Sequence, residues 1–177
     1  HREHDPGMLE GGLDDVVASG RPRRRTPQVL DGGVDLVQRD VPMTAVTQQL
    51  RRPPRAAVGV AYRCPCGWPA VMATAPRLPD GTPFPTMYYL TCPRLNAALS
   101  TLEASGFMRE QAAALAADPD RADAYRRAHE RYLRERSALG DVPQISGVSA
   151  GGMPERVKCL HALAAQSLAA GRGVNPV

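Results

Sequence analysis

Four cysteines are the residues of this chain best suited to carry chemistry. Cys64 and Cys66 stand together in "YRCPCGWPAV", Cys92 lies in "LTCP" and Cys159 in "KCLH". In an extended segment, residues i and i+2 point to the same face, so Cys64 and Cys66 can direct both sulfurs at one point. This pair has three interpretations, which are one corner of a metal site, a reactive thiol pair, or two small residues in a core.

The first interpretation extends to all four cysteines if the strands around them form a meander. Cys64 would then end the first strand and Cys92 the third, which places both at the same end of the sheet. We expect Cys159 in the first turns of a helix that begins near Pro154 and is aimed at that end. The sequence therefore predicts a metal centre built from Cys64, Cys66, Cys92 and Cys159.

The identity of the metal is suggested by the residues beside the cysteines. Cys-Pro occurs twice, at Cys64–Pro65 and Cys92–Pro93, and this dipeptide accompanies some cluster ligands. An Fe–S cluster is therefore slightly favoured over Zn. Four thiolates leave no open coordination position, so the predicted role is electron transfer, sensing or structural support.

His161 competes with Cys159 as a ligand. Two residues apart in a helix means about 200° around its axis, so both side chains face one metal only if the helix is broken there. We therefore expect Cys159 to be the ligand. His161 is expected to pack in the core, and two other roles are left open, as an alternative ligand or as a group that hydrogen-bonds to a ligand.

The segment before Cys159 predicts a second kind of site. Gly151 and Gly152 precede Pro154, a residue that suits the first position of a helix. Backbone N–H groups at a helix start bind anions, and Arg156 and Lys158 add positive charge. We expect an anionic small ligand over residues 147–158, unless the glycines are only a flexible entry to the helix.

Hydrophobic spacing predicts the elements that position these residues. Three strands are expected, and they cover residues 55–64, 69–78 and 87–92. The predicted helices cover residues 44–52, 93–106, 108–118, 121–140 and 153–171. The expected class is α+β, in which a small three-stranded antiparallel sheet packs with four to five helices.

Composition indicates an extended N-terminal arm before one compact domain. Residues 1–42 are rich in Gly, Asp, Arg and Pro, whereas residues 43–177 hold the predicted elements, and Met43 could be an alternative start. Basic clusters at 21–25 and 51–55 contribute to a net charge of +4. A second hypothesis is therefore an interaction module that docks on RNA or a protein complex through residues 1–55.

The compartment is predicted from the absence of long apolar runs in the sequence. No run approaches the roughly 18 to 20 apolar residues that span a bilayer, and the first residues hold no apolar signal region. We expect a cytoplasmic protein without membrane contact. In a reducing compartment the cysteines are free thiols or ligands rather than structural disulfides, and thiol redox chemistry at Cys64–Cys66 is the third hypothesis.

Two long runs resemble an actinobacterial family, Domain of Unknown Function 501. They are "RCPCGWPAVMATAPRLPDGTPFPTMYYLTCPRLNAALSTLEASGFM" and "GVSAGGMPERVKCLHALAAQSLAAGRGVNPV". The likeness covers about residues 52–177 and does not include the arm. The resemblance implies no established activity and no functional residues, so the candidate sites rest on the residues themselves.

Overall fold

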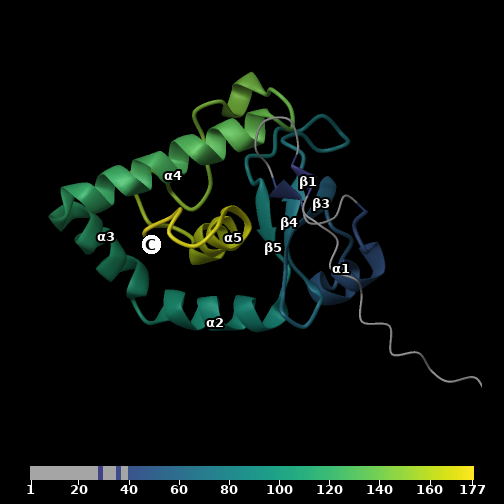
Figure 1. Cartoon of the computed structure of the whole chain (residues 1–177), viewed down its shortest axis with the longest axis horizontal. Coiled ribbons are helices and arrows are strands. Elements are labelled where there is room, and N and C mark those ends of the chain that lie inside the picture. The colour runs from purple at the N-terminus through teal and green to yellow at the C-terminus, as the bar shows by residue number, and fades with distance from the viewer. Residues whose placement is uncertain (1–27, 30–34, 37–39) are drawn as a thin grey trace, which may run out of the picture.

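Three short strands form the sheet that carries the cysteine turn. The computed structural model describes residues 28–29, 35–36 and 40–177 (Figure 1). Strands β3 (Ala57–Arg63), β4 (Pro69–Thr74) and β5 (Tyr88–Leu90) are antiparallel in the order β3-β4-β5. Every residue of the central strand β4 is buried, because it has a neighbour on each side and helices against the sheet. The predicted three-stranded meander is confirmed.

Two residue pairs of the predicted arm are also described. β1 (Gln28–Val29) and β2 (Asp35–Leu36) pair antiparallel, and β2 lies next to β3. The rest of residues 1–39, with the basic cluster at 21–25, lies outside the described residues. The division into an arm over 1–42 and a domain over 43–177 stays a prediction, as does its contact with RNA or a protein complex.

Five α-helices complete the α+β fold in the described part of the chain. They are α1 (Met43–Leu50), α2 (Pro93–Ala104), α3 (Phe107–Ala117), α4 (Pro119–Ser137) and α5 (Leu160–Ala170), with a 3₁₀ turn η1 (Pro143–Ile145) before α5. Pro93 and Pro119 occupy first-turn positions, where a missing N–H costs nothing. The carboxylate of Asp118 caps α4 by accepting from the amides of Asp120 and Arg121 at 3.0 and 3.2 Å.

Helix α5 occupies the centre of the molecule. In Figure 1, α2, α3 and α4 run around it on three sides and the sheet closes the fourth. α5 packs closely on β5 and on α2, and Gln166 donates to the carbonyl of Ala128 in α4 at 2.8 Å. Helix α5 is rich in Ala and Leu with no charged residue, which suits a helix enclosed on all sides.

Tyrosines of α4 join the helices to the sheet. Tyr125 and Tyr132 are fully buried, and the ring of Tyr132 packs edge-on against Tyr88 with centroids 5.9 Å apart. The buried hydroxyls have partners: Tyr132 accepts from the Met87 amide at 2.5 Å, and Tyr88 bonds to Glu135 at 3.0 Å. These contacts fix α4 across the sheet and leave α5 room beneath it.

The last helix begins later than the sequence predicts. The expected helix over 153–171 is wrong in its first part, since α5 starts at Leu160. Gly151 and Gly152 adopt positive φ angles of 71° and 93°, and their carbonyls accept from the amides of Lys158 and Arg156 at 2.7 and 2.9 Å. These turn bonds replace the helical hydrogen bonds of the expected first turns.

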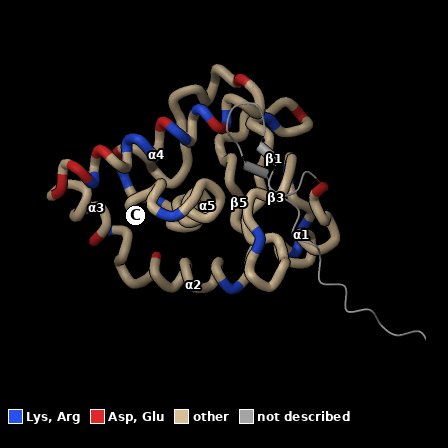
Figure 2. Tube along the Cα trace, viewed as in Figure 1, with Lys and Arg blue, Asp and Glu red and all other residues tan. Residues whose placement is uncertain are grey.

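Charge is concentrated on the outer helix α4. Figure 2 shows acidic and basic residues alternating along α4, whereas α5 and the strands are almost free of them. Arg126 bridges Asp123 and Glu130, each at 2.5 Å, as expected for a solvated helix face. No helix among the described residues is both long and apolar enough to cross a membrane.

Candidate metal site at the start of the last helix

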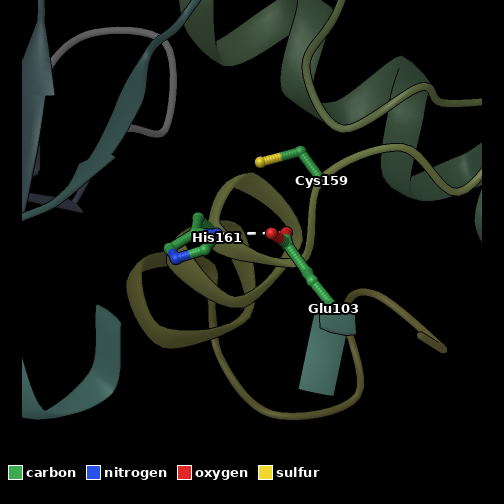
Figure 3. A group of neighbouring side chains, drawn as sticks. All are labelled: Glu103, Cys159 and His161. Atoms are coloured by element: carbon green, nitrogen blue, oxygen red, sulfur yellow. Dashed lines mark hydrogen bonds and ion pairs between the residues drawn. The ribbon is translucent and has the colours of Figure 1, made fainter. Parts of the chain in front are cut away.

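The late start of α5 decides which side chains meet. Cys159 is the residue before the helix and is extended, with φ −150° and ψ 106°, while His161 lies in the first turn. The 200° separation expected of two residues in one helix therefore does not apply. Cys159 and His161 project to the same side (Figure 3), which is the exception that the sequence argument allowed for a helix that does not run through both residues.

Glu103 brings a carboxylate to this point from the end of α2. Its Oε1 accepts from the Leu160 amide at 2.7 Å and lies 3.1 Å from Nδ1 of His161. The first contact satisfies an N–H at the start of α5 that has no partner within the helix. The carboxylate thus caps α5 from another element and holds the His161 ring at the same time.

The three side chains form a compact set of metal donors. A sulfur of Cys159, a ring nitrogen of His161 and a carboxylate oxygen of Glu103 all lie within 4.8 Å of one another. Within the described ranges this is the one group of three or more such residues that meets this distance. Thiolate, imidazole and carboxylate are the donors that zinc takes in proteins.

The second nitrogen of His161 strengthens the case for a cation. Nε2 lies 3.2 Å from the backbone carbonyl of Asn96 and 3.4 Å from the hydroxyl of Ser100. If Nε2–H donates to this carbonyl, Nδ1 presents a lone pair to the Glu103 carboxylate. Two electron-rich atoms at 3.1 Å require a proton or a metal ion between them. A backbone acceptor on the far nitrogen is the usual support of a metal-bound histidine.

The site is half-buried and opens into a pocket. All three residues have intermediate exposure. A pocket of about 300 Å³ adjoins them, lined by Cys159, His161 and Asn96 together with Tyr88, Tyr89 and Leu90 of the sheet end. A metal held by three protein atoms here would keep a position accessible from the pocket.

The other three cysteines lie elsewhere. Cys64 and Cys66 occupy the turn between β3 and β4, with their sulfurs 2.7 Å apart, and Cys92 precedes α2. Cys92 is at the same end of the sheet, as predicted, since Thr91 donates to the carbonyls of Ala70 and Pro69 at the start of β4. The four cysteines do not come within 4.8 Å as one group. Cys159 lies instead beside Glu103 at the end of α2 and His161 of α5.

The two turn thiols differ in acidity. The hydrogen bond shared with Cys64 and the backbone amide of Trp68 lower the pKa of Cys66, and the charge of Arg94 acts in the same direction. The pKa of Cys64 is raised, first by its bond with Cys66.

Comparison with known families places the region that contains the metal-donor group and the cysteine turn in a known family. A family model described as "Protein of unknown function (DUF501)" matches residues 60–177. The chain belongs to the DUF501 family. The resemblance noted in the sequence is thereby confirmed. No curated protein and no solved structure matches this DUF501 chain.

The predicted anion site at Gly151–Gly152 loses its structural basis. It relied on a helix start at Pro154, but the glycines lie in a turn and α5 starts at Leu160. A Cβ on Gly151 would lie 2.4 Å from Cδ2 of Leu163, so this glycine allows the turn to pack on α5. Arg156 and Lys158 remain exposed, and an anion beside them stays a prediction.

The sequence argument missed Glu103. It is the one acidic residue of α2, in a helix whose other residues are mostly small or apolar. That isolation is a signal in the sequence, yet Glu103 stands far from Cys159 along the chain. Only the packing of α2 on α5 makes them neighbours.

Proposed function

We propose that this DUF501 protein binds a zinc ion through Glu103, Cys159 and His161. The observation that carries the proposal is the His161 ring, whose two nitrogens face the Glu103 carboxylate and the Asn96 carbonyl. With Nε2–H directed at the carbonyl, Nδ1 is available to the metal. The Cys159 sulfur and a Glu103 oxygen lie within 4.8 Å.

Zinc suits this donor set better than an Fe–S cluster does. Clusters are held mainly by several cysteine thiolates, and this group contains a single cysteine. Zinc is commonly bound by mixed sulfur, nitrogen and oxygen ligands in a tetrahedral arrangement. The proposal therefore keeps the metal centre that the sequence predicts and changes its ligands and its metal.

The proposed zinc has an open position on the pocket side. Three protein ligands leave a fourth position for water or a small molecule, which is typical of reactive rather than purely structural zinc. The metal would polarise a ligand bound in the pocket. Tyr88, Tyr89 and Leu90 supply walls of mixed aromatic and apolar character for a small molecule.

Metal analysis of purified protein tests this proposal. The full chain is stripped with a chelator, loaded with zinc, desalted and assayed by elemental analysis. Cobalt(II) loading adds a near-ultraviolet band that reports a thiolate ligand. We expect one bound ion per chain and a thiolate–cobalt band. We expect a loss of at least about tenfold in affinity for Glu103→Gln, Cys159→Ser and His161→Asn.

The remaining cysteines provide matched controls. Cys92→Ser and the double variant Cys64→Ser/Cys66→Ser remove thiols without touching the proposed ligands, so they should retain the ion and the cobalt band. Wild-type protein that keeps no zinc would overturn the proposal. So would a zinc ion that is lost in the Cys64/Cys66 variant but kept in Cys159→Ser.

A further inference from the structure

The turn between β3 and β4 holds Cys64 and Cys66 in a fixed arrangement. The Cys64 amide donates to the Trp68 carbonyl at 2.9 Å, and the Gly67 amide donates to the Cys64 carbonyl at 2.8 Å. The Arg63 guanidinium donates to the Gly67 carbonyl at 2.7 Å. Gly67 has φ 88°, a conformation that favours glycine. These bonds fix the turn that carries both cysteines.

The fixed backbone brings the two sulfurs into direct contact. Their separation is 2.7 Å, and the Cys66 amide also lies 3.4 Å from the Cys64 sulfur. A disulfide bond of ~2.05 Å needs an approach of only about 0.7 Å. Both cysteines are free thiols in the structure. The turn thus holds the two sulfurs of the reduced pair within about 0.7 Å of the bonding distance.

The pair is also open to a reaction partner. Cys66 is exposed and Cys64 is partly exposed, at the tip of the hairpin. A thiol that ionises readily and faces solvent is the usual attacking group in thiol–disulfide exchange, while the protonated neighbour completes the reaction. Cys66 is the more exposed of the two sulfurs, which assigns it to the attack and Cys64 to the second step.

We propose that Cys64 and Cys66 form a reversible dithiol–disulfide pair that exchanges with a low-molecular-weight disulfide. The Cys66 thiolate attacks one sulfur of RSSR, which forms a mixed disulfide and releases one thiolate. Cys64 then loses its proton and attacks the Cys66 sulfur, which closes the Cys64–Cys66 bond and releases the second thiolate. Two electrons pass from the protein to RSSR, and two RSH form after protonation. This chemistry is separate from the zinc site.

The sequence provides two direct readouts of the reaction. Trypsin cleaves after Arg63 and Arg77, so both cysteines fall in the single peptide 64–77. Closing the disulfide lowers the mass of that peptide by two hydrogen atoms. Trp68 is the only tryptophan and follows the turn at 48% exposure. A disulfide beside an indole quenches its fluorescence, so oxidation should dim Trp68.

The experiment equilibrates the full chain in mixtures of reduced and oxidised glutathione, followed by acid quench, alkylation and mass analysis. We expect peptide 64–77 to lose two hydrogens and Trp68 fluorescence to fall with the same dependence on the glutathione ratio. Both changes should reverse with excess reduced glutathione. Cys64→Ser should stop at a glutathione adduct on Cys66, and Cys66→Ser should react at least about tenfold more slowly.

Variants of the other cysteines separate this proposal from the zinc site. Cys92→Ser and Cys159→Ser should leave the oxidation of peptide 64–77 unchanged, whether or not zinc is bound. The proposal is overturned if both thiols of the wild type remain alkylatable in oxidised glutathione. It is equally overturned if the disulfide forms between Cys92 and one of the pair instead, or if Cys66→Ser reacts as fast as the wild type.

Discussion

Glu103 has two roles that substitution can separate. Its Oε1 accepts the Leu160 amide at 2.7 Å, which stabilises the start of α5, and the same carboxylate is a proposed zinc ligand. Glu103→Ala removes both roles. Glu103→Gln retains an oxygen that can accept from Leu160 but removes the negative charge that a metal needs.

The stability that Glu103 contributes can be worked out from its hydrogen bond to the Leu160 amide. A hydrogen bond to an ionised group contributes about 1.5 to 3 kcal/mol, and a carboxylate at a helix N-terminus adds about 0.3 to 1 kcal/mol. Because Glu103 is partly exposed and water can replace part of this contact, we expect Glu103→Ala to cost about 2 kcal/mol without metal. At about 2 to 4 °C per kcal/mol this lowers Tm by about 4 to 8 °C. Glu103→Gln should cost about 1 kcal/mol or less.

The zinc role is measured on the same proteins. Zinc at about 100 times its Kd stabilises the wild type by about 2.7 kcal/mol, or about 5 to 11 °C in Tm. In both Glu103 variants this shift should fall to about half or less, because a Kd raised tenfold leaves about 1.4 kcal/mol at the same zinc concentration. Melting is followed by circular dichroism with chelator and with zinc, and Glu155→Ala, at an exposed residue, serves as control.

Two outcomes would refute this reasoning. Glu103→Ala melting within about 1 °C of the wild type in chelator would mean that the Leu160 contact contributes no stability. A full zinc shift in Glu103→Gln would mean that the carboxylate is not a ligand.

Three further predictions concern the elements around the site. Gly151→Ala should lower the free energy of unfolding in urea by about 3 kcal/mol, because the new Cβ would approach Leu163 to 2.4 Å at a φ of +71°. Gly81→Ala is the control, since Gly81 has φ +85° but open space around it, and should cost about 1 to 2 kcal/mol. Equal costs for the two variants would contradict the packing argument. Burial lowers the pKa of His129, so the unfolded chain binds more protons near pH 6 and the free energy of unfolding should fall as pH drops below about 6.5. The urea midpoint of His129→Gln should therefore depend less on pH than that of the wild type. An equal pH dependence in the two proteins would refute this assignment. Arg136→Met should lower the free energy of unfolding by about 3 kcal/mol or more, because the buried guanidinium donates to the carbonyls of Pro85, Ile145 and Val148. A Tm equal to that of the wild type would refute this prediction.

Local sequence signals predicted most of the fold. Proline and glycine bound the helices and turns, and alternating small and β-branched residues indicate the strands, because these signals act over a few neighbouring residues. The C-x-C turn and the position of Cys92 at the same sheet end followed from the meander alone. The resemblance to DUF501 was likewise carried by contiguous residues.

The candidate metal group required the tertiary structure. Helical spacing continued through residues 153–159, but the turn at Gly151–Gly152 forms its own hydrogen bonds and delays α5 to Leu160. Once Cys159 lies outside the helix, it and His161 share one side. Glu103 joins them because α2 packs on α5, a contact between segments far apart in the chain. The sequence determined which donors exist, whereas long-range packing decided which of them meet.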